Sequence, residues 1–481
     1  MTRVAVGVVA AGHPSVVDAA AETLRSGGNA FDAVLAAGFA AAVVEPMFTS
    51  LGGGGFLLAH TADGRDQIFD FFVDMPGRGL PEPKRAVHFE PVAVHFPSSD
   101  QIFNIGLGSV ATPGNLRGFL HAHERLGTLP LREVIGPAET MARDGVVLNA
   151  HQAYVIDLLL PINTHSEMGR SLFAPEGRAL RVGERLCNRS LAAFLEELPR
   201  DGGRDLYEGA LAQRIERDMR EGDGLLTRDD LRSYRVAERA PLELRYRGRR
   251  LLTNPAPSLG GELIARTLGG LERDGLEEER WGSAAHLCAL ASRMEQTERA
   301  RTAGGTTHIS VCDAHGNAAS MSLSNGEGSG YFAPDTGIML NNMLGEDDLH
   351  PTGFHTGPPG ERVASMMSPT LVFEADEVRM ILGSGGSKRI RTALVQVISN
   401  VLDFGRPLGD AIDAPRIHWD GAALQIEPGL PVEGLEALRA CLPVNEWSEK
   451  NLYFGGVHGV AVGQGGWGDP RRGGAARSVT R

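Results

Sequence analysis

The sequence predicts a mixed α/β (α+β) fold, in which a largely helical stretch is followed by one rich in strands. Helical periodicity dominates residues 115–300, whereas alternating apolar and polar residues become common after residue 306. The 62 glycines are too many for a simple helical bundle and indicate many tight turns and close backbone contacts. The 481 residues can form either one large layered domain or roughly two to four smaller domains.

The N-terminal elements are predicted from apolar runs and from the residues that end them. Residues 4–11 are predicted to be the first strand and not a signal peptide, because no clear basic region or cleavage site accompanies them. A helix over residues 15–24 ends at Ser26-Gly27-Gly28, and Asn29 then caps a second helix over residues 30–44. This second helix is apolar on nearly every face, so we expect it to be buried.

Four consecutive glycines at 52–55 come next, followed by predicted strands over residues 56–59 and 68–73. A phosphate-binding loop would need a Lys-Ser/Thr pair and a following helix, and the run has neither. The glycines are therefore expected to allow close packing of the backbone in the core.

The rest of the chain is predicted to change from helices to strands near residue 306. Apolar residues at helical spacing predict helices over residues 116–126, 131–144, 191–198, 210–221, 262–271 and 284–301. The charged, alternating stretch 234–252 predicts exposed antiparallel strands. Later strands are predicted over residues 309–312, 318–323, 370–373 and 378–382, with a helix over 390–402. The Gly/Arg-rich tail from residue 465 is expected to fray at its end.

Charge and cysteine spacing exclude several classes of protein. The chain has 47 Lys and Arg against 60 Asp and Glu, with no basic run before its tail, so neither nucleic acid nor an anionic membrane is an expected partner. No apolar run reaches the ~18 residues of a membrane span. The four cysteines, which include no CxxC pair, are Cys187, Cys288, Cys312 and Cys441. We expect buried free thiols, no zinc site and no disulfide framework. A cytoplasmic location is expected, with a periplasmic or secreted one left open.

The stretch Gly304-Gly305-Thr306-Thr307-His308 carries the most specific chemical signal in the sequence. A threonine inside a chain is a poor nucleophile, because no neighbouring base takes its proton. Cleavage of the Gly305–Thr306 bond would give Thr306 a free α-amine with a pKa near ~7.7–8.0, which can act as the base for its own hydroxyl. The alternative interpretation is a Gly-Gly turn that leads into an ordinary threonine-rich strand.

Longer motifs are spread over almost the whole chain. In order they are GGNAFDAVLAAGFAAAVVEPMFTSLGGGGFLL, SVATPGNLRGFLHAHERLGTLP, LYEGALAQRIERDMREGDGLLTRDDLRSYRV, NPAPSLGGELIARTL, TTHISVCDAHGNAASMS, TGIMLNN, MSPTLVF, LGSGGSKRI and GDPRRGGAA. Together they resemble the γ-glutamyltranspeptidase family of N-terminal-nucleophile hydrolases. The resemblance implies a four-layer αββα sandwich, made as an inactive precursor that cuts itself between Gly305 and Thr306. It also implies that the segments 1–305 and 306–481 remain together as one intertwined domain.

The resemblance further implies which residues surround the nucleophile. Ser324 matches a family threonine whose hydroxyl steadies the nucleophile, and serine keeps that hydroxyl. Gly385 and Gly386 match the pair whose backbone N–H groups form the oxyanion hole, where glycine lets the backbone approach the oxyanion closely. No metal or organic cofactor is expected.

The pocket for the amino-acid end of a γ-glutamyl group departs from the family pattern. Phe72 stands where the family has an arginine that binds the α-carboxylate, and Ser365-Met366 replaces a Ser-Ser pair. Met343 replaces a Gln or Glu that holds the α-amine. A free carboxylate placed against these apolar side chains would lack its partner, which is energetically costly.

Asn325 and Glu346 are expected to remain as polar contacts in this pocket. We therefore expect a self-processing amide hydrolase or acyltransferase with altered acyl-group specificity, which takes a small-molecule amide and passes the acyl group to water or to an amine. One alternative is a genuine γ-glutamyl hydrolase or transferase of glutathione metabolism, with the carboxylate held by residues outside these motifs. The other is a catalytically silent family member that serves as a binding protein. Association of two processed molecules into a homodimer is left open.

Overall fold

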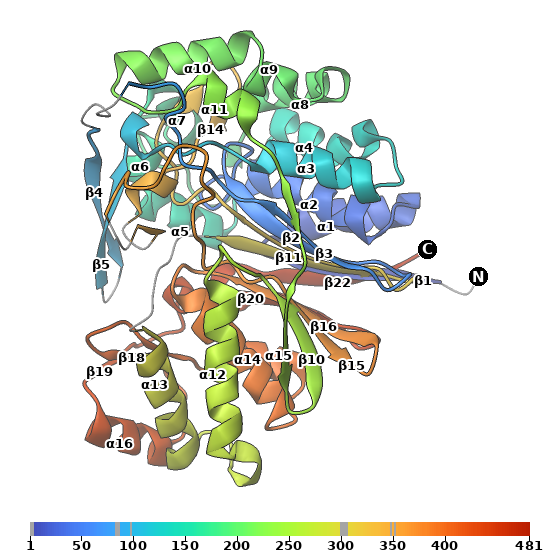
Figure 1. Ribbon diagram of the computed structural model, residues 1–481, viewed down its shortest axis with the longest axis vertical. Coiled ribbons are helices and arrows are strands. Elements are labelled where there is room, and N and C mark those ends of the chain that lie inside the picture. Colours follow the sequence, from blue (N-terminus) through green and yellow to red (C-terminus); the bar gives the residue numbers. More distant parts are fainter. Residues whose placement is uncertain (1–3, 82–86, 97–98, 299–305, 347–348, 351–352) are drawn as a thin grey trace.

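Two β-sheets lie face to face in the computed structural model, and helices cover the outer face of each sheet (Figure 1). The structure describes residues 4–81, 87–96, 99–298, 306–346, 349–350 and 353–481. The four-layer αββα arrangement confirms the fold class expected from the sequence. Among the described residues, no helix is both long and apolar enough to span a bilayer.

The first sheet has seven antiparallel strands drawn from both sides of residue 305. Their order across the sheet is β22 (Ala475–Thr480), β1 (Ala5–Ala11), β11 (Thr307–Asp313), β12 (Ala318–Ser324), β2 (Gly54–His60), β3 (Asp66–Phe71) and β8 (Ala237–Arg239). β11 and β12 follow residue 305 in sequence, yet they lie between β1 and β2, which precede it. The two parts of the chain are therefore interleaved within one sheet.

The second sheet has six antiparallel strands and is interleaved in the same way. Their order is β21 (Gly465–Trp467), β20 (Gly456–Ala461), β16 (Glu377–Gly385), β15 (Thr370–Glu374), β10 (Arg249–Thr253) and β9 (Leu242–Tyr246). β15 from the C-terminal part pairs with β10 from the N-terminal part. β11 and β12 of the first sheet pack against β16 of the second, so the central strands of both sheets meet in the middle of the molecule.

Helices from the N-terminal part lie on and around the outer side of the first sheet, and the first three of them pack directly on its strands. They are α1 (Pro14–Ser26), α2 (Ala30–Val44), α3 (Asn115–Leu126), α4 (Leu131–Asp144), α5 (Ala150–Leu158), α6 (Leu160–Asn163), α7 (Glu167–Phe173), α8 (Arg189–Asp201), α9 (Arg204–Tyr207), α10 (Ala210–Glu221) and α11 (Arg228–Ser233). The helix predicted to be buried is α2, and each of its residues is buried. Asn29 caps it as predicted and forms a reciprocal capping box with Asp32.

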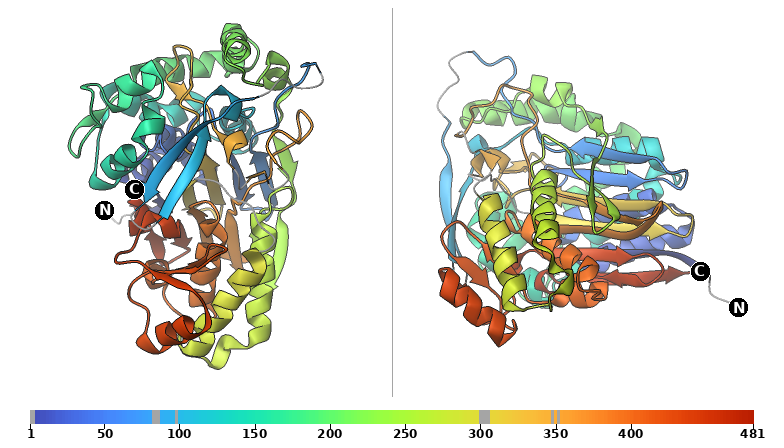
Figure 2. Two further views of the ribbon diagram at one scale, coloured as in Figure 1. Left: turned by 90° about the vertical axis from the view of Figure 1, so that its left-hand side faces the viewer. Right: turned by 60° about the horizontal axis from the view of Figure 1, so that its bottom comes forward.

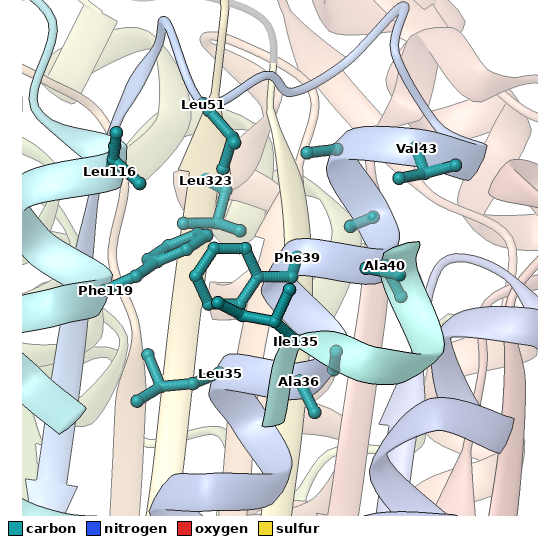
Figure 3. Packing of buried hydrophobic residues seen from close by; sticks show 14 of the residues in the cluster. Leu35, Ala36, Phe39, Ala40, Val43, Leu51, Leu116, Phe119, Ile135 and Leu323 are labelled. Atoms are coloured by element: carbon teal, nitrogen blue, oxygen red, sulfur yellow. The ribbon is translucent and has the colours of Figure 1, made fainter. Parts of the chain in front are cut away.

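The core above the first sheet is built around α2, as Figure 3 shows. Phe39 of α2 meets Phe119 of α3 edge to face, with ring centroids 5.0 Å apart. Leu35, Ile135 and Leu323 belong to the same cluster and bring α2, α4 and β12 together. A helix that is apolar on every face thus has partners on every face, which is why it can lie in the interior.

Helices on the other side cover the second sheet. They are α12 (Gly260–Asp274), α13 (Ala284–Glu298), α14 (Arg389–Leu402), α15 (Leu408–Asp413) and α16 (Val432–Cys441). α14 packs on β16 and β20, and α12 packs on α14 and α13. Short strands also pair outside the two large sheets. These pairings join β6 (Val146–Val147) to β7 (Arg185–Leu186), β13 (Phe332–Ala333) to β14 (Ile338–Met339), and β18 (Leu424–Ile426) to both β17 (Ile417–Trp419) and β19 (Val444–Glu446).

A hairpin that the sequence analysis missed runs along one side of the molecule. It consists of β4 (Glu90–Phe96) and β5 (Ser99–Ile105), which pair with each other and with no other strand in the part of the chain that the structure describes. Figure 2 shows it extending from the helices above the first sheet toward the second sheet. Its strands alternate only weakly between apolar and polar residues, so the pattern was not distinctive in the sequence.

Three sequence-based expectations were wrong. The C-terminal tail does not fray, because β22 pairs with β1 and the Arg481 N–H donates to the Val4 carbonyl oxygen at 2.9 Å. The strand β10 is not exposed, because it lies between β9 and β15 and buries residues 251–253. Only Cys312 is a buried thiol: Cys187 and Cys288 are partly exposed, and Cys441 is exposed at the end of α16.

Candidate active site

Thr306 lies immediately before β11, and its side chain is buried. Its carbonyl oxygen accepts a hydrogen bond from Arg472 Nη1 at 3.1 Å. The backbone of Gly385 lies directly against it, because a Cβ atom on Gly385 would be 1.9 Å from the Thr306 carbonyl oxygen. Only glycine therefore fits at position 385. Gly305, the other side of the expected cleavage site, lies outside the described residues.

The pairing of β11 with β12 brings Ser324 to the same place. Thr307 pairs with Leu323, so the next step in this antiparallel register sets Thr306 opposite Ser324. Ser324 is buried, and its Oγ accepts the Gly326 N–H at 2.9 Å. Two segments that are distant in sequence thus meet at the start of β11.

Gly385 and Gly386 form the turn between β16 and α14. Gly386 has a φ of +120°, which side chains with a Cβ rarely adopt, and Ser387 follows with a φ of +60°. A Cβ atom on Gly386 would lie 2.6 Å from the Gly455 Cα. The structure therefore brings the predicted residues Thr306, Ser324, Gly385 and Gly386 together.

Arg472 is the main residue that the sequence analysis missed at this site. Its guanidinium is buried, lies 5.0 Å from the centroid of the Phe48 ring and contacts the Thr306 backbone. Burial and the nearby Arg389 lower the pKa of Arg472 to about 10, which leaves it charged near neutral pH. The two adjacent arginines of the motif GDPRRGGAA were the signal for this residue, but the sequence did not indicate which part of the fold their side chains contact.

Buried ion pairs hold the short 3₁₀ turn Pro470–Arg472 in place. Arg471 donates to Glu427 at 2.5 Å and to Asp469 at 3.2 Å, and Arg416 donates to Asp469 at 2.5 Å. Burial alone would raise the pKa of Asp469, but Arg416 and Arg471 lower it to about 2. Because each buried charge has an opposite partner, the turn that presents Arg472 is rigidly fixed.

Glu45, at the end of α2, lies behind the start of β11. Its Oε2 accepts the Thr307 hydroxyl at 3.4 Å, and a Cβ atom on Gly12 would lie 2.4 Å from its Oε1. Burial raises the pKa of Glu45 to about 7, although Arg472 and Thr307 both act in the opposite direction. The sequence signal for this residue is an acidic side chain directly after the last turn of a helix that is otherwise apolar apart from Asp32.

Changing Glu45 to Gln should alter how stability depends on pH. Between pH 4.5 and about 7 the folded protein binds more protons at Glu45 than the unfolded chain, so the free energy of unfolding falls as pH rises through this window. Glutamine does not titrate. As the pH rises from 4.5 to 7.5, the free energy of unfolding of Glu45→Gln should therefore increase by up to ~3 kcal/mol relative to that of the protein with Glu45. Denaturant titrations of both forms at each pH, in a Thr306→Ala background that keeps one chain, measure this difference. A difference that does not change with pH would contradict the assignment.

His308, the third residue of the TTH motif, has a structural position. Its Nδ1 lies 2.9 Å from Ser322 Oγ and its Nε2 lies 3.0 Å from Ser310 Oγ. Burial, with a further contribution from His458, holds the pKa of His308 well below its usual value. The ring is therefore neutral and fixed between two hydroxyls, and it does not serve as a base for Thr306.

A cavity of about 230 Å³ opens beside this constellation. Hairpin β4–β5 supplies one wall, and the turn after Gly386 together with Arg472 supplies another. The apolar lining residues are Phe48, Phe96, Ile102, Phe103, Val155, Leu158, Leu159 and Leu452. The remaining ones are Gln101, Glu327, Glu346, Gly386, Ser387, Lys388, Arg389 and Arg472.

Of the residues predicted to bind substrate, Glu346 lines this cavity. It is buried next to Gly326, where a Cβ atom would lie 2.4 Å from Glu346 Oε1. Asn325 lies just behind the lining, and its N–H donates to the Phe48 carbonyl oxygen at 3.0 Å. Ser365 does not reach the cavity lining; its Oγ accepts the Met367 N–H at 3.1 Å and stabilises a local turn.

Phe72 and Met366 lie in the apolar core between the layers, not along the cavity. Both are buried and belong to one apolar cluster with Met343. The Phe72 ring stacks on Phe56 with centroids 5.6 Å apart. The three positions where the sequence departs from the family pattern thus all lie in this extended apolar core.

Arg362 brings a positive charge next to the Phe72 segment from elsewhere in the chain. It lies 3.3 Å from Asp70 and 3.0 Å from Asp74, and it donates to the Tyr234 hydroxyl at 2.7 Å. Its charge is therefore already balanced by two carboxylates of the protein.

Comparison with known proteins finds relatives that match most of the chain. The family model described as gamma-glutamyltranspeptidase matches residues 17–303 and 283–479. The chain is 30% identical to the glutathione hydrolase proenzyme of Escherichia coli K12, over 90% of this chain and 85% of that protein. It is equally 30% identical to the acylase ACY 1 proenzyme of Pseudomonas sp. strain V22, over 90% of this chain and 86% of that protein.

Solved structures show the same fold. The cephalosporin acylase from Bacillus halodurans superposes with a TM-score of 0.81 at 25% identity, covering 99% of this chain and 96% of that one. The γ-glutamyltranspeptidase of Helicobacter pylori matches 60% of this chain and 80% of its own, with a TM-score of 0.52 at 28% identity. The protein is thus an amide hydrolase or transferase of γ-glutamyltransferase type with an N-terminal-nucleophile hydrolase fold, and it belongs to the γ-glutamyltranspeptidase family.

Proposed function

We propose that this protein is a self-processing enzyme that hydrolyses or transfers acyl groups through Thr306 after cleavage of the Gly305–Thr306 bond. Cleavage leaves the segments 1–305 and 306–481, which the interleaved sheets hold together. The approach of Gly385 to Thr306 and the position of Ser324 opposite it support this assignment. The names of the relatives add support, since the E. coli glutathione hydrolase and the Pseudomonas acylase are both called proenzymes.

Processing begins with attack of the Thr306 hydroxyl oxygen on the Gly305 carbonyl carbon. The C–N bond breaks as the C–O bond forms, the hydroxyl proton passes to the departing Thr306 nitrogen, and an ester results. Water then hydrolyses the ester and leaves a Gly305 carboxylate and a free Thr306 amine. Arg472 and Glu45 position the backbone at this point, through the Thr306 carbonyl oxygen and the Thr307 hydroxyl.

Turnover repeats the same chemistry on an external amide. The Thr306 hydroxyl attacks the substrate carbonyl while the Thr306 amine accepts the proton. The oxyanion is stabilised by the N–H groups of Gly385 and Gly386. The leaving amine takes the proton, and water or an amine acceptor then removes the acyl group from the ester.

We infer that the acyl group is not γ-glutamyl but has an apolar body. The observation that carries this inference is that Phe72, Met343 and Met366, which replace the family's polar contacts, are buried in the apolar core and do not line the cavity. A glutamyl carboxylate that lost its hydration in the cavity without gaining a replacement partner would cost ~1–3 kcal/mol or more. The cavity beside Gly386 instead offers aromatic and aliphatic side chains on the β4–β5 side.

A panel of p-nitroanilides tests the substrate class. We expect phenylacetyl-p-nitroanilide to be cleaved with a kcat/KM at least about tenfold higher than that of γ-glutamyl-p-nitroanilide, because ~1.4 kcal/mol corresponds to a factor of ten. Phe103→Ala should raise KM for the phenylacetyl substrate by removing part of the apolar wall. Val432→Ala, which changes an exposed apolar residue on α16, should leave KM unchanged.

A second candidate function is true γ-glutamyl hydrolysis or transfer with a different carboxylate-binding site. Glu327, Glu346 and Lys388 line the same cavity and could complement the amine and carboxylate of a zwitterionic glutamyl group. This candidate predicts that γ-glutamyl-p-nitroanilide is the better substrate and that Lys388→Ala raises its KM. Efficient turnover of the γ-glutamyl substrate would overturn the apolar assignment.

A further inference from the structure

Helix α13 belongs to the layer of helices on the outer face of the second sheet (Figure 1), and it ends at Glu298, shortly before Thr306 in the sequence. Glu298 Oε2 accepts a hydrogen bond from Arg391 Nη2 of α14. The Glu298 side chain is 5% exposed and the Arg391 side chain 3%, so both charges are withdrawn from water. Burial lowers the pKa of Arg391 to about 10, which leaves it charged near neutral pH.

This buried ion pair stands where apolar side chains would also fit. Met294 on α13 and both Ile390 and Leu394 on α14 are buried in the apolar core. None of the described residues donates a hydrogen bond to Glu298 Oε1. Removing a carboxylate and a guanidinium from water is costly, and apolar replacements of such pairs are often neutral or stabilising. What the pair supplies is therefore a defined position for the end of α13.

Arg391 lies in the first turn of α14, next to the expected oxyanion hole. The Arg389 N–H donates to the Gly386 carbonyl oxygen at 3.0 Å, and the Ile390 N–H donates to the Ser387 carbonyl oxygen at 3.1 Å. Arg391 is thus connected to the Gly385–Gly386 turn through a single hydrogen-bonded turn. The ion pair therefore ties the end of α13 to the element that approaches Thr306.

The stretch of chain that joins Glu298 to Thr306 is anchored at both of its ends. Glu298 binds Arg391, and the Thr306 carbonyl oxygen binds Arg472 Nη1 at 3.1 Å. Both arginines belong to segment 306–481. The Gly305–Thr306 bond lies in the sequence between these two anchors, at the end nearer Thr306.

We propose that Glu298 and Arg391 are positioning residues for self-processing, because their ion pair fixes the start of the stretch that ends in the Gly305–Thr306 bond. This inference rests on the proposed cleavage before Thr306. Attack of the Thr306 hydroxyl on the Gly305 carbonyl requires close alignment of the two groups, and a distant change that displaces them by ~1 Å can lower a rate ~10²-fold. After cleavage the Gly305 carbonyl takes no part in turnover, so the pair should affect processing and not hydrolysis of external amides.

The rate of processing in newly made precursor tests this role. Full-length chains are made in a cell-free system with labelled methionine, translation is stopped, and loss of the 51.3 kDa band is followed on a denaturing gel. Glu298→Ala and Arg391→Met should each slow this loss at least about tenfold. Glu298→Gln keeps an oxygen that can accept from Arg391 and should be slowed less than Glu298→Ala. Loss at the wild-type rate in Glu298→Ala and Arg391→Met would overturn the proposal.

A second ion pair on the same helix provides matched controls. Arg293 of α13 donates to Asp274 at 2.9 Å, and both side chains are partly exposed. Arg293→Met and Asp274→Asn remove the same kinds of charge without affecting the contact between Glu298 and Arg391. Both variants should be processed at the wild-type rate, and slowing equal to that of Arg391→Met would contradict a specific role for the buried pair.

Two further measurements separate positioning from a loss of stability. Leu290→Ala removes a buried side chain from the same helix, and it should be processed at the wild-type rate. Circular dichroism in a Thr306→Ala background verifies that Leu290→Ala and Glu298→Ala are both folded at the assay temperature. Equal slowing of these two folded variants would assign the effect to the stability of α13 and overturn the proposal. Chains of Glu298→Ala that complete processing should have the wild-type kcat, and a lowered kcat would contradict a role confined to processing.

Failure of this proposal and failure of the cleavage itself give different results. A wild-type chain that stays at full length would refute the proposed cleavage. A wild-type chain that is cut no faster than Glu298→Ala and Arg391→Met would refute only the positioning role of the pair.

Discussion

Thr306→Ala is expected to remain a single chain of 51.3 kDa and to lose amidase turnover. Alanine has no hydroxyl to attack the Gly305 carbonyl, so neither processing nor acyl transfer can begin. Removal of a catalytic nucleophile typically lowers kcat by ~10⁴ or more. Intact mass after purification reports processing, and release of p-nitroaniline reports turnover.

The matched control for this variant is Thr306→Ser, which keeps both a hydroxyl and, after cleavage, a free amine. It should be processed and should retain measurable turnover. An unprocessed Thr306→Ala chain with undiminished activity would refute the mechanism. Processing of the alanine variant at the same position would refute it as well, because it would require a different nucleophile.

Gly385→Ala should have the second largest effect. The added methyl would lie 1.9 Å from the Thr306 carbonyl oxygen, so the backbone must move away from the nucleophile. Displacing the N–H groups of the expected oxyanion hole should lower kcat by ~10²–10³. Steady-state kinetics on the purified protein measure this loss, and circular dichroism verifies that the fold is retained.

Gly136→Ala is a suitable control for that experiment. Gly136 lies within α4, and a Cβ atom added there meets no other atom within 4 Å. The substitution lies in α4, away from the residues assembled around Thr306, so the variant should be fully active. If Gly385→Ala retained the turnover of this control, Gly385 would have no part in stabilising the oxyanion.

The sequence predicted those parts of the fold that local rules determine. Asn29 and the apolar run after it were sufficient to locate a capped, buried helix, because capping and periodicity act over a few residues. The strands around Thr306 and Ser324 alternate clearly, and their short turn determines their register. The roles of these residues came from the family resemblance and stay predictions until the variants are measured.

Other parts of the site depend on contacts between distant segments and were not predictable in this way. Arg472 meets Thr306 across 166 positions, and Glu45 meets Thr307 across 262. Hairpin β4–β5 forms a cavity wall only because the remaining chain places it there.

The interleaved sheets affect how the protein folds and whether it can refold after denaturation. Strands β11 and β12 fit between β1 and β2, so the precursor reaches this arrangement as one chain. Once the chain is cut, reassembly after denaturation requires an encounter between two separate polypeptides, and its rate depends on their concentration. The active form should therefore be long-lived while intact but poorly renaturable at low concentration.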